Sequence, residues 1–420
     1  MTFTMTTPQT LGLEPSFGYG DRLGLATPGH LMAQLGRGGP IQPIFAQQSI
    51  REMKRTGRTA ADVMQDAVDG LLAGEFGGRW GADADHLKTH DDVQVTAEAG
   101  FVFFTIDPSD EVDQRADLYP PDVLESKFEQ IRSQITWIDQ YLGTTVAVEN
   151  GPTIHFDEAC VKRAAVKYGR ALIRALDMAA CIGAAAEQRG QDHEIELSVD
   201  ETPQPTSLAE HYIIADQLGQ ARVKLVSLAP RYIGDFEKGI DFKGDLAAFE
   251  QSLAQHAAIA RQLGPYKLSL HSGSDKLSIY EIFARVTRGL FHVKTAGTSY
   301  LEALRVVVRK DPSLMERIID FSRRCFDRDK ATYHISATLG AVPEPTQIAD
   351  PKQIERIYLD QNDGRQILHV TYGSVLTDPT LGPMVPDILQ AYPQTHCQVL
   401  EDHFGNHLDA LVRGLGKIGT

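Results

Sequence analysis

Acidic and histidine side chains end several of the short apolar runs in this sequence. Asp85 and His86 close the run WGADADHL, and His271 closes YKLSLH. A neutral imidazole binds divalent cations, and an adjacent carboxylate can move a proton on the substrate that such a cation polarises. The pattern therefore indicates a metal ligand, His86, beside an acid/base group, Asp85. The alternatives are a hydrogen-bonded turn in which Asp85 caps a helix and, for His271, a hydrogen-bonded core histidine.

A second acid/base group is expected where the run EIELSVDE ends. Asp200 and Glu201 are consecutive there. Alternation along a strand sends them to different faces, so we expect only one of them to meet the interior of a barrel. We choose Glu201 as this group, and the alternative is an ordinary solvated strand end.

A site for an anionic group is predicted after the last run. Lys294 and Thr295 lie just before the turn at 297–299, which opens a helix that Ser299 is expected to cap. Backbone amides at a helix start bind carboxylate or phosphate, so Lys294 and Thr295 are predicted to hold a charged group of the substrate. The alternative is a plain glycine turn with Lys294 directed outward. The other substrate contacts predicted at run ends are Lys88, Arg231 and Asp275.

Other histidines compete for a third position around a metal ion. His334 follows the last run and could reach over the site, although such a residue is more often structural. His30 and His292 are the competitors. A separate group near the C-terminus has helical spacing, and we interpret it as a surface or interface cluster: His403, His407 and Asp409.

The elements that must position these groups form a repeated pattern. Short, mostly apolar runs alternate with amphipathic segments, which indicates a parallel sheet covered by helices. The fold class predicted is α/β, a (β/α)8 TIM-type barrel with a helical insertion and a C-terminal appendage. Active sites of such barrels lie at the C-terminal ends of the strands, and seven of the eight run ends carry ionisable groups. The runs are residues 23–28, 43–49, 80–87, 101–108, 194–201, 223–230, 266–272 and 290–297.

The domain organisation follows from the lengths of the connections. We expect the barrel at 1–300, with the helical insertion at about 109–193, where the connection is too long for one barrel helix. The remaining 301–420 are expected to form an α+β appendage near the barrel mouth. Within it, 314–324 has a helical pattern, whereas 332–337 and 367–375 resemble strands.

Composition and charge exclude several classes of protein. The 420 residues are 42% hydrophobic and carry a formal net charge of −15, which disfavours nucleic acid as a partner. No apolar run approaches the roughly 18 residues of a membrane span, and the Thr-rich N-terminus does not resemble a signal peptide. The four cysteines form no CxxC pair, so we expect reduced thiols in the cytoplasm.

Several segments together resemble the tagaturonate epimerase family. They are WGADADHLK, ELSVDETPQPT, KLSLHSGSDKLSIY, HVKTAGTSYLEALR and YHISATL, in that order. The resemblance implies a cytoplasmic enzyme of hexuronate catabolism that interconverts D-tagaturonate and D-fructuronate with a divalent cation such as Zn, Mn, Ni or Co. It further implies Asp85 as proton acceptor and Glu201 as proton donor. The implied metal ligands are His86, His271 and His334.

A fainter similarity connects the chain to class II ketose aldolases. That group also places an Asp-His pair at a strand end and a second metal histidine in a Leu-His-Gly-like segment, where this chain has Ser272 in place of glycine. The alternatives to the epimerase are therefore an aldolase-like lyase on ketoses or sugar acids, or a non-catalytic sugar-acid binding protein. The expected partner is a small sugar acid, and a homo-oligomer is left open.

Overall fold

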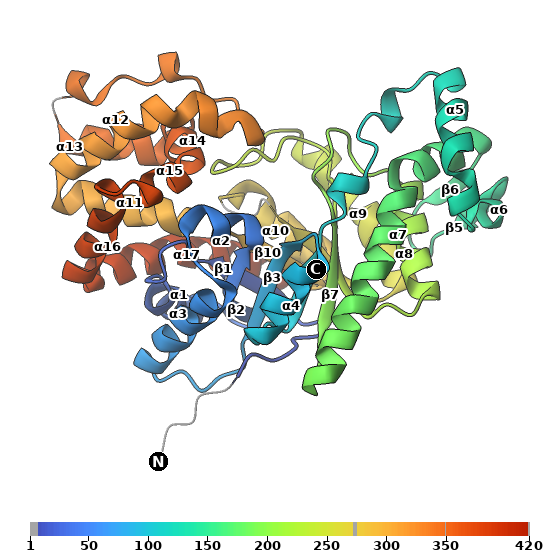
Figure 1. The fold of residues 1–420 in the computed structure, drawn as a ribbon, viewed down its shortest axis with the longest axis horizontal. Coiled ribbons are helices and arrows are strands. Elements are labelled where there is room, and N and C mark those ends of the chain that lie inside the picture. Colours follow the sequence, from blue (N-terminus) through green and yellow to red (C-terminus); the bar gives the residue numbers. More distant parts are fainter. Residues whose placement is uncertain (1–6, 272–274, 349, 419–420) are drawn as a thin grey trace.

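The protein is built around a closed barrel of eight parallel strands in the order β1-β10-β9-β8-β7-β4-β3-β2 (Figure 1). The computed structural model describes residues 7–271, 275–348 and 350–418. Helices surround the barrel, so the predicted TIM-type barrel is confirmed. None of the helices in the described part of the chain is long and apolar enough to span a bilayer. The barrel strands are β1 (Ser16–Gly20), β2 (Gln42–Ser49), β3 (Gly81–Leu87), β4 (Phe103–Ile106), β7 (Glu194–Val199), β8 (Leu225–Pro230), β9 (Lys267–Leu270) and β10 (Phe291–Thr295).

The first strand of the barrel is β1, so the prediction of a strand at residues 23–28 is wrong. Two glycines in the five residues of SFGYG indicate a turn on sequence grounds, yet here they permit close strand packing. A Cβ on Gly20 would lie 2.5 Å from Cα of Ala296 and 2.7 Å from the carbonyl oxygen of Thr295. Residues 23–28 instead lead into α1 (Thr27–Arg37), whose first turn contains a proline. The other seven predicted runs overlap observed strands, although Ser272, the last residue of the seventh, lies outside the described residues.

Strand β3 forms despite its poor β-propensity because each face has a specific partner. Asp83 and Asp85 point into the barrel, where Nζ of Lys294 lies 2.8 and 2.7 Å from their carboxylates. Ala82 and Ala84 alternate with them and are fully buried. Small residues outside and acids inside therefore fit this strand between its neighbours and the helices.

The outer layer is completed by a helix from the far end of the chain. α17 (Pro393–Leu415) packs against both α1 and α10 (Leu277–Val286) and so closes the ring of helices around the barrel. The remaining helices next to the barrel follow their strands in the usual alternation. They are α2 (Ile50–Thr56), α3 (Ala60–Ala73), α4 (His90–Glu98), α8 (Leu208–Gln220), α9 (Leu246–Leu263) and α10.

The long connection between β4 and β7 contains the expected helices and also a small antiparallel sheet. The sheet pairs β5 (Thr144–Ala147) with β6 (Thr153–Phe156). The helices are α5 (Pro121–Ile131), α6 (Ile138–Tyr141) and the 32-residue α7 (Glu158–Arg189), which packs along α4 and α8. In Figure 1, α5, α6 and the β5–β6 sheet project from the barrel on the side opposite α12–α16.

The segment after β10 contains helices and loops but no strand among its described residues, so the two strands expected there are wrong. Residues 367–375 form the end of α14 and the start of α15, and 332–337 form a short turn and an extended loop without strand partners. Ile367, Leu368 and Val370 are buried in an apolar core shared by these helices, so packing overrides their β-propensity. The helices are α11 (Thr298–Lys310), α12 (Pro312–Asp329), α13 (Pro351–Glu355), α14 (Asn362–Val370), α15 (Tyr372–Thr377) and α16 (Leu381–Ala391).

Candidate active site

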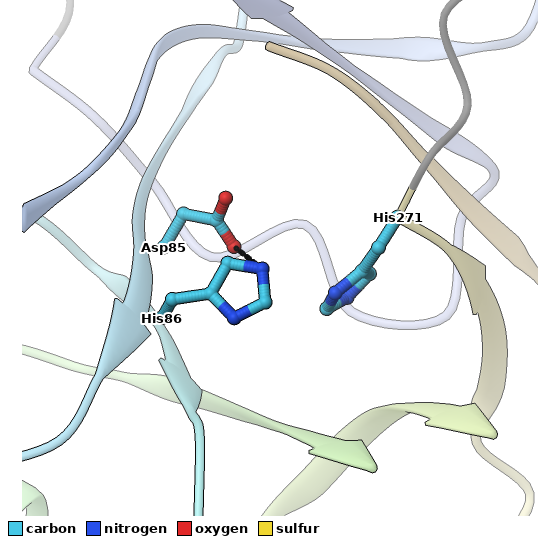
Figure 2. Close-up of side chains that lie close together, drawn as sticks. All are labelled: Asp85, His86 and His271. Atoms are coloured by element: carbon cyan, nitrogen blue, oxygen red, sulfur yellow. Dashed lines mark ion pairs between the residues drawn. The ribbon is translucent and has the colours of Figure 1, made fainter. Parts of the chain in front are cut away.

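Three of the predicted site residues meet at the C-terminal ends of the barrel strands. Asp85 and His86 end β3, and His271 directly follows β9 (Figure 2). One potential ligand atom from each lies within 4.8 Å of the others, and the two imidazole centroids are 5.2 Å apart. His86 has a φ of 53°, a left-handed backbone that few residues other than glycine adopt. Such backbone strain often accompanies a functional site.

The His86 ring is oriented by two carboxylates. Its Nδ1 lies 3.0 Å from Oδ2 of Asp107, and its Nε2 lies 3.7 Å from Oδ1 of Asp85. Burial opposes protonation, but Asp85 and Asp107 raise the pKa of His86 to about 10. A ring whose Nδ1 is held by a carboxylate presents Nε2 to a cation, and binding of that cation would displace the proton.

The His271 ring is held from the opposite side of the site. Its Nε2 lies 2.5 Å from Oε1 of Glu196, and its Nδ1 lies 3.5 Å from Oδ1 of Asp200. Glu196 is fully buried inside the barrel. Asp200 therefore approaches the imidazole, whereas Glu201 lies 3.5 Å from the Arg51 guanidinium. Both acids follow the end of β7 and line the same cavity, so strand alternation does not separate them.

That cavity occupies about 530 Å³ above the histidines. Its wall combines charged and aromatic side chains, and it includes three predicted site residues besides His271: Glu201, Arg231 and His334. A smaller cavity of about 40 Å³ adjoins it, lined by Asp85, His86 and the residues just before α11. Four residues line both cavities: Arg51, Lys238, His271 and Tyr333. The arrangement can hold a small polar molecule beside the three clustered side chains.

Arg231 and Lys88, the two other predicted cations, differ in their surroundings. The Arg231 guanidinium donates to the carbonyl of Tyr232 and lies 5.5 Å from the Phe236 ring centroid. It forms no ion pair with a carboxylate among the described residues. Lys88, by contrast, lies 2.7 Å from Asp110 and is absent from the lining of the large cavity.

Lys294 lies inside the barrel and contacts acids rather than the large cavity. It is 1% exposed, and its Nζ lies 2.7 to 2.9 Å from three carboxylates and 2.5 Å from Oγ1 of Thr105. The three acids hold the pKa of Lys294 well above its usual value although burial opposes this. The carboxylates belong to Asp83, Asp85 and Glu196.

The side chains of Thr295 and Ser299 are hydrogen-bonded to backbone carbonyl groups in this structure. The Thr295 hydroxyl donates to the carbonyl of Gly18. Ser299 lies within α11, not at its N-cap, and donates to the carbonyl of Gly20. Thr295 therefore joins β1 to the end of β10, and Ser299 joins β1 to the first turn of α11.

The predicted third metal ligand does not join the cluster in this structure. The His334 side chain is 69% exposed, and its Nε2 lies 3.5 Å from Asp235. His30 is buried against Ser299, where burial lowers its pKa to about 3, and His292 is buried beside Ser16. Asp85 is the third donor that the geometry brings to His86 and His271.

Asp275 belongs to a second cluster that connects the barrel to the C-terminal helices. Its carboxylate lies 2.7 Å from Arg365 of α14 and 2.9 Å from Nε2 of His403 on α17. His407 is buried and accepts a hydrogen bond from the Asp275 backbone N–H. The surface interpretation of the histidines is therefore wrong, although Asp409 does lie at the surface, paired with Arg37.

Two residues with important contacts were not predicted from the sequence. Glu196 lies within the run EIELSV, and the signal for it is a charge in the middle of a buried parallel strand. Arg51 lies in the first turn of α2, where an arginine is unremarkable by position. Only the three-dimensional arrangement places it opposite Glu201.

Comparisons with known proteins match nearly the whole chain. A family model described as tagaturonate epimerase matches residues 1–411. A curated tagaturonate/fructuronate epimerase from Thermotoga maritima is 44% identical over 404 residues, covering 96% of this chain and 82% of that protein. The native crystal structure of a fructuronate-tagaturonate epimerase from Cohnella laeviribosi has a TM-score of 0.89 at 37% identity, covering 97% of this chain and 83% of that chain. The same enzyme complexed with one glycerol gives a TM-score of 0.88.

Proposed function

Because this chain belongs to the tagaturonate epimerase family, we propose that it interconverts D-tagaturonate and D-fructuronate with the help of a divalent cation. Family membership makes the protein an epimerase, in the isomerase class. The observation that supports the cation is the cluster of Asp85, His86 and His271 at the barrel mouth.

The donor set fits a divalent transition metal. Two imidazoles and a carboxylate suit Zn, Mn, Ni or Co better than Ca or Mg. Asp107 behind His86 and Glu196 behind His271 are carboxylate partners of the kind that orient metal-binding imidazoles. A cation bound there would polarise the ketone of the substrate. His334, the third ligand that the family resemblance implies, lines the same cavity but lies outside this cluster, and a variant tests its role.

Asp85 and Glu201 are the proposed proton carriers. Burial favours the neutral form of Asp85, but His86, Lys294 and His271 hold its pKa well below its usual range, so this carboxylate is ionised. Glu201 lies across the cavity, where Arg51 orients its carboxylate. A substrate in the cavity would thus lie between an acceptor and a donor.

The position of the inverted carbon favours a retro-aldol route. The two hexulosonates differ at the carbon β to the ketone, which enolisation does not acidify. In the proposed route Asp85 takes the proton of the β-hydroxyl, the bond between the α- and β-carbons breaks, and the electron pair moves toward the ketone. The β-carbon becomes an aldehyde, turns, and is attacked again on its other face while the proton returns to its oxygen. No atom is gained or lost.

Isotope exchange separates this route from its rival. In direct proton transfer Asp85 would remove the hydrogen on the β-carbon and Glu201 would return one from the other side. Carried out in D₂O, the retro-aldol route leaves the original hydrogen on the inverted carbon. Deuterium found there in every product molecule would exclude it.

Arg231 is the group we propose for the substrate carboxylate. It lines the cavity and forms no ion pair with a described carboxylate, whereas Lys294 is fully engaged below the site. A guanidinium binds a carboxylate through two parallel hydrogen bonds. This choice replaces Lys294 with Arg231 as the first candidate.

Incubation of the purified protein with D-fructuronate tests the function as a whole. Tagaturonate should form, a chelator should stop its formation, and one of Zn, Mn, Ni or Co should restore it. Release of a free aldehyde and a three-carbon ketone would instead indicate a lyase. Tight binding without conversion under any of these metals would indicate a binding protein.

A further inference from the structure

The ammonium group of Lys294 lies where three carboxylates converge on the barrel axis. Nζ is 2.8 Å from Asp83, 2.7 Å from Asp85 and 2.9 Å from Glu196, and the Thr105 hydroxyl is 2.5 Å away. All of these side chains are almost completely buried. Four oxygen ligands around one positive centre are the surroundings that hard cations prefer in proteins.

A cation at this position is electrostatically required. Three carboxylates held this close in a dry interior repel one another strongly, and removing the positive partner of a buried pair costs about 3–5 kcal/mol. Oε2 of Glu196 accepts no hydrogen bond among the described residues, so this carboxylate has unused capacity toward a cation. The cage therefore requires positive charge, and Lys294 supplies a single unit.

The charges also match the proposed metal site next to it. Three carboxylates and one ammonium leave two negative charges, which a single divalent cation neutralises. The two positions share an atom, because Oδ1 of Asp85 lies 2.7 Å from Nζ of Lys294 and 3.7 Å from Nε2 of His86. Carboxylates that bridge two cations in this way are typical of two-metal sites, whose ions lie about 3.5–4 Å apart.

We propose that Lys294 occupies the second cation position of what would otherwise be a two-metal centre, so that the enzyme binds one divalent cation. The vacated position in Lys294→Ala would offer oxygen ligands only, from Asp83, Asp85, Glu196 and Thr105. The present N–O distances of 2.5 to 2.9 Å are closest to calcium–oxygen distances of about 2.3–2.6 Å, so Ca²⁺ needs the smallest rearrangement. Mn²⁺ accepts the same ligands.

Ion counting tests the proposal. Wild-type enzyme and Lys294→Ala, both full length, are stripped with a chelator, dialysed against Mn²⁺ or Ca²⁺, and analysed by elemental mass spectrometry. With Mn²⁺ we expect one ion per wild-type chain and two per Lys294→Ala chain, a twofold increase. The electron paramagnetic resonance spectrum of the variant should show two coupled Mn²⁺ ions. With Ca²⁺ the variant should gain an ion that the wild type does not retain.

Two variants serve as controls. Lys294→Met removes the charge but fills the space, so it should gain no ion. Lys267→Ala removes another buried ammonium of the barrel, one that contacts Ser16 and the Glu14 backbone and forms no ion pair with a described carboxylate, and it should also gain none. A second ion in Lys267→Ala would mean that any lost lysine admits a cation, which contradicts the proposal.

Each remaining outcome supports or overturns the idea. A folded Lys294→Ala that binds only one Mn²⁺, or a wild type that binds two coupled ions, overturns it. If the variant is insoluble in chelator, refolding with Ca²⁺ or Mn²⁺ should rescue it, and no rescue also overturns it. The inference rests on the proposed metal site, and the wild-type count separates the two: no ion in the wild type contradicts the metal site itself.

Discussion

At the level of single residues, the sequence predicts those site residues that are adjacent in the chain or lie at strand ends. Asp85 and His86 are adjacent, and strand-end placement brings His271 to them. The partners that orient the imidazoles could not be predicted in this way, because Glu196 reaches His271 across the barrel and depends on strand register. Lys294 was expected to bind an anion of the substrate, and it instead binds anions of the protein. A lone sequence cannot distinguish these, because both require the lysine to face the interior.

Metal content should depend on His86 and not on His334. His86→Ala removes a ligand inside the cluster. Asp107→Ala removes the carboxylate that orients this ligand, and for that variant we expect about a 10–100-fold loss of metal affinity. His334→Ala should retain the metal, because that side chain is 69% exposed and paired with Asp235. Titration of metal-free protein with Zn²⁺ or Mn²⁺ gives the affinities. Loss of metal from His334→Ala would instead identify it as a ligand that moves in.

Arg231→Met should impair recognition of the substrate carboxylate. A hydrogen bond to a charged group contributes about 1.5–3 kcal/mol, so KM for fructuronate should rise about 10- to 100-fold. Any activity on fructose, which lacks the carboxylate, should change much less. Lys88→Met is the matched control, since Lys88 pairs with Asp110 and does not line the large cavity. An unchanged ratio of uronate to ketose activity would assign the carboxylate to another residue.

At the scale of elements, seven of the eight strands could be predicted because buried parallel strands are apolar and end in polar groups. The exceptions have physical causes. β1 contains glycines that close packing requires, and residues 367–375 have β-branched side chains that a helical core buries. Both depend on contacts with distant segments, which local propensity does not contain. The proposed division of the chain near residue 300 stays a prediction.

Gly20→Ala should destabilise the barrel where β1 meets β10. The added Cβ would collide with backbone atoms of Thr295 and Ala296, which cannot rotate away as a side chain would. Overpacking of this kind costs about 1–3 kcal/mol, measurable as a lower urea midpoint. Gly183→Ala in α7 is the control, because no atom lies within 4 Å of its added Cβ. It should instead stabilise the protein by about 0.5–1 kcal/mol. Equal effects of the two substitutions would contradict the packing argument.

Over the whole molecule, one buried charge network connects the barrel to the helices that follow it. Asp275 precedes α10, Glu302 lies on α11, Arg365 on α14 and His403 on α17. The network explains how a helix at the end of the chain is fixed to the barrel. In it the Asp275 and Glu302 carboxylates face two guanidinium groups and one imidazole, because Arg305 also lies 2.6 Å from Glu302. Protonation of His403 should therefore affect the stability of the molecule as a whole.

The stability that His403 provides should fall as the pH rises. Burial opposes its charged form, but Glu302 and Asp275 raise the pKa of His403 above its usual value of about 6.5, against the influence of Arg365. A raised pKa means that the folded state retains a proton that the unfolded state releases above pH 6.5. The contribution is thus complete below about pH 6.5 and is lost as the pH rises through the folded pKa.

Urea unfolding of the wild type and His403→Gln, with a chelator present to exclude metal effects, measures this contribution. Their difference in unfolding free energy should be largest at about pH 5.5 and should shrink steadily toward pH 9, because glutamine cannot titrate. Asn406→Gln, at an exposed position on the same helix, should show no trend. A difference that stays constant over this range would mean that His403 acts only through packing and neutral hydrogen bonds. A difference that grows with pH would mean that a protonated His403 is unfavourable here, with Arg365 and Arg305 as the cations opposite Asp275 and Glu302.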